Sequence, residues 1–430
     1  MPLLTTLAPE LLLKILDCLL TDPPSLLRCA HVCGALRPYA LEVFFRDTEL
    51  VETTHSVNRT REFAQLLESN HTIASYIRTL RLGVDLSGHR ETDDRGRLWN
   101  PFEHPYVLGS FPLPLLSELR ELVLNDGMML WDPAREVVSV LKAVPRLERL
   151  TLQGVLVASM PMPPMHRSPT ALSVAQNKPP LSLKTLDIEH APSFPVYELV
   201  RRLLEEFGDG LRLETLVARC VRWQDLFEHH DGWIPFISAM KTSLRHLDIS
   251  TGERNQCDWI MTGSEYDSDE RMSFHTSLFH AVRECEALRT LHLDYVLPSW
   301  ISSDNNFESA SFLRSLCVLL ENRPAFSNHL EQLSLNMTDW HEIAVSVDRA
   351  SGHRLSRVLT DATRYPKLTM FSLEVQIDGT PGASDEEVSP LEEDEDCEEV
   401  TTRWIDAFEG FVNYVQANDR LTFEFTAYAP

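Results

Sequence analysis

One short stretch of the sequence groups residue types that commonly bind metal ions. Cys29, His31 and Cys33 supply two thiols and an imidazole close together in the chain. Zinc sites of this kind need a second pair of ligands, and none follows at a zinc-site spacing. On the helix expected here the three side chains do not share one face. We therefore interpret them as residues of a helix core rather than as metal ligands.

A second group has His229 and His230 beside Asp225, Glu228 and Asp231. Adjacent side chains on a helix diverge, so they do not readily grip a single ion. A solvated turn is the preferred interpretation, and no metal or cofactor is expected.

The sequence offers no motif for catalysis. His341-Glu342 begins like the HExxH pattern of zinc proteases but lacks the second histidine. Glycine-rich phosphate loops and the serine nucleophile elbow are absent as well. An active site assembled from distant residues would leave no such trace. We nevertheless predict that the protein is not an enzyme.

Composition narrows the class of partner. The formal net charge is -25, and no run rich in lysine or arginine offsets it. Phosphate backbones and acidic membrane surfaces would be repelled, so nucleic acid and membrane are not expected partners. The 43% hydrophobic and 24% charged residues are typical of a folded globular chain. A basic or neutral protein partner fits this charge best.

The sequence favours an intracellular location, cytoplasmic or nuclear. Eight cysteines in 430 residues are sparse and mostly sit in apolar contexts, which favours reduced thiols. The apolar start lacks a basic leader segment and is interrupted by Glu10, Lys14 and Asp17, so a signal peptide is not expected. The sequence contains no run of about 18 uncharged apolar residues, so a membrane span is not expected.

The first fifty residues carry the spacing of three short helices. Pro9 suits a first helical turn, and Glu10 lies favourably near the positive end of the helix dipole. The stretch 22–25 breaks this helix and offers a cap for the next, over 26–33, and a third is expected over 36–45. A unit of roughly forty residues seldom buries enough surface to be stable alone. It needs a partner or a neighbour.

The order of these signals resembles the F-box family. The matching residues are Leu7-x-Pro9-Glu10-Leu11, then Ile15-Leu16, then Leu26-Leu27-Arg28-Cys29-Ala30-x-Val32-Cys33. The resemblance covers residues 5–46 and departs from the family where Gly34-Ala35-Leu36 replaces its usual tryptophan. It implies a module over residues 1–50 that docks on the Skp-type adaptor of a cullin-RING ubiquitin ligase. The adaptor-binding residues that it implies are Leu7, Pro9, Glu10, Ile15, Leu16, Leu26, Leu27 and Val32.

Beyond residue 75 a six-residue pattern recurs, with apolar residues at its first, fourth and sixth positions. Such a segment predicts a β-strand, and most gaps between copies hold a segment with helical spacing. A single strand and helix cannot bury both apolar faces, whereas stacked copies share one continuous core. The nine copies begin at Ile77, Leu119, Leu147, Leu183, Leu213, Leu244, Leu288, Leu330 and Leu368. The helical segments are Thr60–Leu67, Ala134–Ala143, Val196–Phe207, Ile234–Lys241, Phe274–Cys285, Phe312–Glu321 and Leu355–Thr363.

This arrangement resembles leucine-rich repeats of the longer, helix-containing type. The predicted fold class is α/β: a short all-α F-box-like module followed, over 51–430, by an irregular solenoid with parallel strands on the concave side and helices outside. Copies are spaced unevenly, and none has the asparagine or cysteine that the family places after the strand. An alternative layered α/β fold stays open.

Insertions are expected between copies, where loops lie outside the stack. They fall at 86–114 and 160–180, and an acidic loop is expected at about 378–400. That loop contains ten acidic residues and no basic one over Ser384–Glu399, so we expect it to be solvated; phosphorylation of its serines is an alternative. A helix over Thr402–Gln416 and a strand over Leu421–Tyr428 would close the stack.

Side chains alternate between the two faces of a strand, so residues beside the inward-facing apolar positions should lie on the concave surface. We predict that this surface binds an unknown protein target. The candidate residues are Thr79, Arg81, Glu121, Arg149, Asp187, Arg219, His246, Asp248, His292, Asp294, Gln332 and Asn336.

The sequence thus predicts a substrate-recognition subunit of a Skp-cullin-F-box ubiquitin ligase, with the helical module on the adaptor and the repeats on the target. The alternative is a ligase-independent interaction scaffold in which the F-box remnant only caps the solenoid.

Overall fold

The computed structural model describes residues 7–52, 59–84, 108, 111–125, 129–130, 132–157, 181–189, 196–219, 230–250, 278–295, 308–340, 349–378, 402, 406, 408–417 and 421–428. The chain divides into two compact units, Met1–Pro195 and Val196–Pro430. None of the helices in the described ranges has the length and apolarity needed to cross a lipid bilayer.

Three short helices open the first unit, as predicted. They are α1 (Pro9–Asp17), α2 (Pro23–Val32) and α3 (Arg37–Arg46). Each has proline in its first turn, and the Asp22 carboxylate caps α2 by accepting a hydrogen bond from the Ser25 amide at 3.3 Å. Tyr39 and Phe44 pack against the apolar core of the module, so it holds aromatic contacts despite the missing tryptophan. The buried core residues are Leu16, Leu26, Ala30, Ala40 and Val43.

The helical module joins the sheet without a linker. Helix α3 runs directly into β1 (Asp47–Glu52), so the predicted boundary at residue 50 falls inside a strand. The Arg78 amide donates to the Arg46 carbonyl at 2.8 Å, at the start of the pairing between β1 and β2. The Arg46 guanidinium also pairs with Asp17 of α1 at 2.9 Å and with Asp47 at 3.2 Å. Arg46 therefore ties the helices to the first strand.

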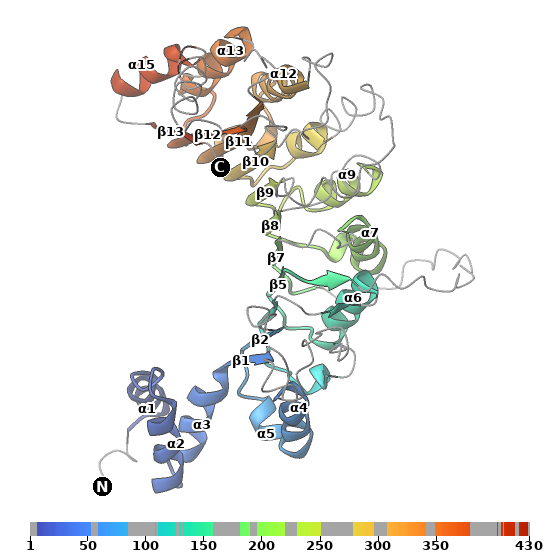
Figure 1. Cartoon of the computed structure of the whole chain (residues 1–430), viewed down its shortest axis with the longest axis vertical. Helices are drawn as coiled ribbons and strands as arrows, with labels where there is room; N and C mark the ends of the chain where they lie inside the picture. The colour runs from blue at the N-terminus through green and yellow to red at the C-terminus, as the bar shows by residue number, and fades with distance from the viewer. Residues whose placement is uncertain are drawn as a thin grey trace, which may run out of the picture. The chain divides into compact units, whose positions relative to one another are not determined.

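The sheet of the first unit is parallel and follows chain order. In Figure 1 the helices that follow β1 lie together on one side of the strands. The strands after β1 are β2 (Thr79–Val84), β3 (Glu121–Leu124), β5 (Arg149–Gln153) and β7 (Thr185–Glu189). The helices are α4 (Arg59–Ser69), α5 (His71–Ala74) and α6 (Pro133–Ala143), with a 3-10 turn at Leu113–Leu115. A separate short pair joins β4 (Met129–Leu130) and β6 (Leu156–Val157).

The second unit repeats the same order of helix and parallel strand. Its helices follow the outer side of the curved row of strands, as Figure 1 shows. The strands are β8 (Thr215–Ala218), β9 (His246–Ser250), β10 (Thr290–Tyr295), β11 (Gln332–Trp340), β12 (Met370–Asp378) and β13 (Thr422–Tyr428). The helices are α7 (Val196–Phe207), α9 (His230–Ala239), α12 (Glu308–Glu321), α13 (Arg349–Thr360) and α15 (Glu409–Ala417). Residues 278–283 are also helical, and 3-10 turns cover Gly208–Gly210 and Ala325–Asn328.

All nine predicted copies form parallel strands, which confirms the α/β repeat fold. Equivalent apolar positions meet across neighbouring strands: Leu291 of β10 pairs in register with Leu333 of β11, and Leu333 pairs with Phe371 of β12. All three are fully buried. The seven helical segments are helices with shifted ends, and the last helix and strand are α15 and β13. The insertion at 160–180 and the acidic loop at Ser384–Glu399 lie outside the described residues, as does most of 86–114.

Charged residues at the strand starts pair between neighbouring repeats. All of these residues except Glu118, which directly precedes its copy, occupy the second position of the repeat pattern, and most of their side chains are at least a third exposed. Exposed pairs of this kind add little stability, so the apolar contacts dominate. The pairs are Arg78–Glu118 at 2.7 Å, Lys184–Glu148 at 2.8 Å, Arg245–Glu214 at 3.1 Å and Arg289–Glu331 at 3.5 Å.

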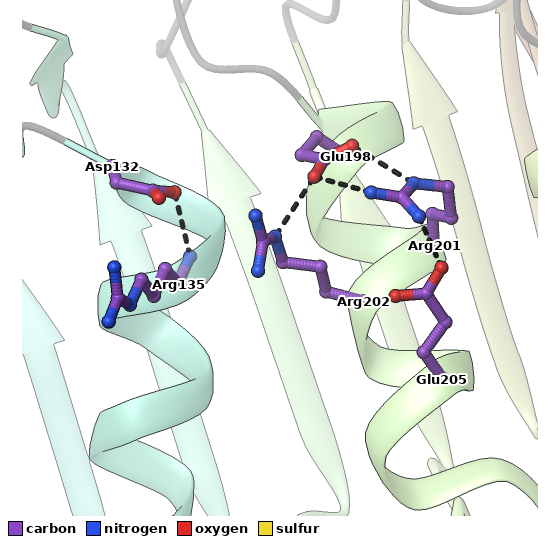
Figure 2. Close-up of polar contacts among 6 residues, drawn as sticks. All are labelled: Asp132, Arg135, Glu198, Arg201, Arg202 and Glu205. Carbon is purple, nitrogen blue, oxygen red and sulfur yellow. Dashed lines mark hydrogen bonds and ion pairs between the residues drawn. The ribbon is translucent and has the colours of Figure 1, made fainter. Parts of the chain in front are cut away.

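Two of the outer helices show how local sequence fixes their ends and solvent faces (Figure 2). The Asp132 carboxylate accepts a hydrogen bond from the Arg135 amide at 3.1 Å and so caps α6. On α7 the Glu198 carboxylate pairs with Arg201 at 2.7 Å and with Arg202 at 2.9 Å. Burial alone would raise the pKa of Glu198, but hydrogen bonds and charge from the two arginines outweigh it and lower the pKa below its ordinary value of 4.5.

Leu333→Ala should test the shared core directly. The side chain is fully buried between two strands, so truncation should lower the free energy of unfolding by about 2–5 kcal/mol. Urea denaturation followed by circular dichroism measures this. The neighbouring Gln332→Ala, at an exposed position, should change stability by no more than about 0.5 kcal/mol. Equal effects of the two variants would contradict the assigned inward and outward faces.

Glu198→Gln should lower stability at neutral pH by about 0.2–1 kcal/mol, the range for partly exposed ion pairs. Because the folded-state pKa is lowered, the stabilisation is present above pH 4.5 and is lost as the pH falls through the folded-state pKa. The difference from the unsubstituted chain should therefore shrink towards acid pH in denaturation curves. Glu409→Gln is the control, since Glu409 is exposed and has no ion-pair partner among the described residues. A difference that grew towards acid pH would refute this assignment.

Candidate interaction surfaces

Seven predicted target-binding residues come together on one face of the second unit. The parallel register places His246, Asp248 and Ser250 of β9 opposite Thr290, His292 and Asp294 of β10. The next strand continues these three rows with Gln332, Ser334 and Asn336. The alternating Leu247 and Ile249 side chains are buried, so the rows occupy the opposite side of the sheet. The seven are Arg219, His246, Asp248, His292, Asp294, Gln332 and Asn336.

Polar contacts order part of this face. The Arg219 guanidinium, just beyond β8, contacts one carboxylate oxygen of Asp248 through Nη2 at 2.6 Å and Nε at 3.0 Å. The other oxygen of Asp248 lies 4.0 Å from His292 Nε2. His246 Nδ1 and Thr290 Oγ1 are 3.0 Å apart across the β9–β10 pair. These contacts link side chains from three consecutive strand regions.

One row has the residue types of a serine hydrolase but not its contacts. Asp248, His292 and Ser334 follow one another in register on three adjacent strands. A triad needs the acid hydrogen-bonded to the histidine and the histidine to the serine. Here Arg219 holds Asp248, the His292 distance exceeds a hydrogen bond, and Ser334 has no hydrogen bond to His292. The row does not support hydrolysis as it stands.

The other five predicted target-binding residues lie on the first unit. Thr79, Glu121 and Arg149 share one row, and Arg149 pairs with Glu121 at 3.3 Å. Arg81 and Asp187 lie in the next row, with two strands between them. Strand β1 adds Asp47 and Glu49 to these two rows. The sequence prediction missed both because the segment 47–52 lacks the repeat pattern.

Apolar side chains are exposed on the helical module. Within the described residues seven large apolar side chains are exposed, and five of them belong to this module. Leu66 and Val318 are the two outside it. This concentration makes the module a candidate contact surface, because water disfavours exposed apolar area. The five are Leu11 at 49%, Ile15 at 45%, Leu20 at 40%, Leu27 at 37% and Val32 at 75% exposure.

The eight residues suggested by the F-box resemblance divide between surface and core. Leu16 and Leu26 are 4% and 1% exposed and pack inside the module, which removes them as direct contacts. Leu7 is half-buried. Leu11 and Leu20, which that set did not contain, join the surface. The remaining exposed members are Pro9, Glu10, Ile15, Leu27 and Val32.

The described residues offer no metal centre. Nowhere in the described ranges do three or more histidine, cysteine, aspartate or glutamate side chains gather around a possible ion position. Cys29 packs against the core of the module, as predicted, whereas His31 is exposed. Burial raises the pKa of the Cys285 thiol to about 12, which makes it unreactive near neutral pH. His341 and Glu342 lie outside the described residues, as do Asp225, Glu228 and His229. His230 and Asp231, from the same group as His229, begin α9.

Comparisons with known proteins give no family. No family model matches the chain, and no curated protein matches it. Among solved structures, a leucine-rich repeat-containing protein, LegL7 from Legionella pneumophila, aligns at 11% identity with a TM-score of 0.35. The alignment covers 88% of this chain and 87% of that protein. The fold assignment therefore rests on this chain's own strands and registers.

A double-mutant cycle should measure the contact between Arg219 and Asp248. We expect Arg219→Ala and Asp248→Asn to show a coupling free energy of about 0.2–1 kcal/mol, because Arg219 is about half exposed. Urea denaturation of the single and double variants gives the coupling. Arg219→Ala combined with Gln332→Ala is the control and should be additive. Full additivity in the first cycle would show that the ion pair contributes nothing.

Proposed function

We propose that this protein is a substrate-recognition subunit of a Skp-cullin-F-box ubiquitin ligase. In this proposal the helical module docks on the Skp-type adaptor, and the outward face of the strands holds a target protein. The chain itself supplies no catalytic group. The ligase's other subunits carry out ubiquitin transfer.

The observation that carries the proposal is the exposed apolar surface of α1 and α2. Leu11 and Ile15 are four residues apart and share one face of α1, while Leu27 and Val32 project from α2. Fully burying a leucine-sized side chain contributes roughly 1.5–3 kcal/mol. Because these four side chains are 37–75% exposed in the free chain, an interface that covers them gains part of that amount from each. A module that keeps its own core and still exposes these residues is suited to a partner surface.

The polar rows of the two units support the target-binding half of the proposal. These rows carry hydrogen-bond donors and acceptors and charges of both signs. The side chains project from strands, which are more rigid than loops. Ordered contacts such as Arg219 with Asp248 hold side chains in place before a target arrives. A preformed surface loses less conformational entropy on binding.

A second function is favoured by the junction at Arg46. Helix α3 continues into β1 and contacts both β1 and α5, as a cap on the first repeat would. The alternative is thus a ligase-independent interaction scaffold in which the F-box remnant only protects the end of the stack.

A pull-down with a purified Skp-type adaptor tests the proposal. The intact chain should bind, and Leu27→Glu with Val32→Glu should weaken binding by at least about tenfold, because two apolar contacts are replaced by charges. Leu66→Glu with Val318→Glu is the matched control, since both side chains are exposed elsewhere. No association of the intact chain, under conditions in which a known F-box protein binds, would overturn the proposal.

Deleting residues 1–46 separates the two functions. A remainder that stays folded by circular dichroism but no longer binds the adaptor supports the receptor. Global unfolding of the remainder supports the cap.

A further inference from the structure

The outer surface of the second unit carries an excess of positive charge around α12 and α13. The stretches from Phe312 to Leu330 and from Ala350 to Thr369 contain six lysines and arginines but only two acidic residues. The whole chain, in contrast, has a formal net charge of -25. Both helices lie on the outer side of the strands in Figure 1, so this surface is separate from the polar rows.

A buried contact brings basic residues together near the carboxyl end of α12. Tyr365 is fully buried, and its hydroxyl donates a hydrogen bond to the Leu320 carbonyl at 2.7 Å. This contact holds the segment after α13 against the last turn of α12, where Arg364 acts on the charge of Glu321. From within α13, Arg354 reaches the same carboxylate with Nε at 3.1 Å and Nη2 at 2.6 Å.

Three guanidinium groups share the Glu321 carboxylate, those of Arg354, Arg357 and Arg364. Arg354 supplies the hydrogen bonds, whereas Arg357 Nη2 lies 3.8 Å from the nearer oxygen, beyond hydrogen-bond distance. The hydrogen bond from Arg354 and the charges of all three arginines hold the pKa of Glu321 below its ordinary value of 4.5. One negative charge thus faces three positive charges, so the group stays positive at neutral pH.

Two of these arginines keep donor groups that no described residue uses. Arg357 is 78% exposed, and the long contact with Glu321 is its one ion pair within the described ranges. Arg364 makes an ion pair with Asp361 at 3.9 Å, and its buried Nε has no hydrogen-bond partner. One oxygen of Asp361 instead accepts from the Thr363 amide at 2.9 Å and hydroxyl at 2.7 Å. An acceptor that engaged Arg357 and Arg364 would therefore displace no hydrogen bond of theirs.

The turn after α12 adds a further arginine, and α12 itself adds an apolar side chain. Arg323 is exposed and has a φ of 49°, in the left-handed region that glycine usually occupies after a helix. A residue with a side chain stays there at some cost in backbone strain. Val318 lies three residues before Glu321, on the same face of α12, and is exposed. An apolar position thus lies beside the positive charges.

We propose that an arginine surface made by Val318, Arg323, Arg357 and Arg364 binds an acidic segment of a partner protein. Carboxylates of that segment would accept hydrogen bonds from the guanidinium groups, whose planar shape suits them. An apolar residue of the segment would cover Val318. Nucleic acid fits poorly, because the acidic remainder of the chain repels a long phosphate backbone. The arginine surface uses neither the helical module nor the polar rows, so it is independent of the proposed function.

Fluorescence anisotropy on the full chain tests the proposal with a labelled eight-residue peptide that has leucine at its third and sixth positions and glutamate elsewhere. The intact chain should bind it saturably, and the same peptide with glutamine in place of glutamate should not bind. Added salt should weaken binding, because exposed charges are screened. Arg323→Gly combined with Arg357→Gln should weaken binding by about tenfold, because charge-assisted hydrogen bonds are lost.

The fold of this double variant should persist. Arg357 is exposed, and glycine suits the positive φ at residue 323, so the midpoint of urea denaturation should not fall. Arg61→Gln combined with Arg212→Gln is the matched control for overall charge and should leave binding unchanged, since both side chains are exposed and neither has an ion-pair partner in the described part of the chain.

Two results would overturn the proposal. One is failure of the intact chain to bind the glutamate peptide, or equal binding by the intact chain and the Arg323→Gly, Arg357→Gln variant. The other is binding that occurs only after residues 384–399, with their ten acidic residues, are deleted. That result would assign the arginine surface to the chain's own acidic segment instead of a partner.

Discussion

The structure depends on one constraint: a strand and a helix cannot bury their apolar faces unless a neighbouring strand and helix complete the core. Apolar side chains at matching positions therefore meet across consecutive strands, as Leu291, Leu333 and Phe371 do in the second unit. Each contact sets the register of the next pair, and a shift by one residue would expose the whole apolar row. Ion pairs at the strand starts lie beside this core and add little to it.

The helices that open the first unit are joined closely to its first strand. In the first unit, α3 runs into β1, and Arg46 joins helix, strand and the Asp17 carboxylate. A small helical unit that would be marginal alone gains support from the sheet. In the second unit, α15 contacts β13, the last strand in the described part of the chain. The helices of the first unit thus combine support for β1 with an exposed apolar surface.

The polar surface follows from the same constraint. Because every second strand residue must face the core, the remaining residues form rows whose composition is free to vary. In the second unit these rows bring Arg219, Asp248 and His292 together from distant parts of the chain. Their contacts order the side chains of this face: Asp248 is engaged by Arg219, and no serine of the described residues is hydrogen-bonded to His292.

The sequence alone determined the repeat fold, because leucine spacing reports directly which side chains must be buried together. It located nine strands and the helices between them, and it named residues such as His246 and Gln332 that do share one face. It missed β1, whose Asp-Thr-Glu-Leu-Val-Glu segment is a strand only because β2 offers it a pairing edge. It also assigned Leu16 and Leu26 to a contact surface, although only packing among α1, α2 and α3 decides which leucines of an amphipathic module face inward. Pairing edges and buried faces are set by neighbours distant in sequence, so the tertiary structure alone decided them.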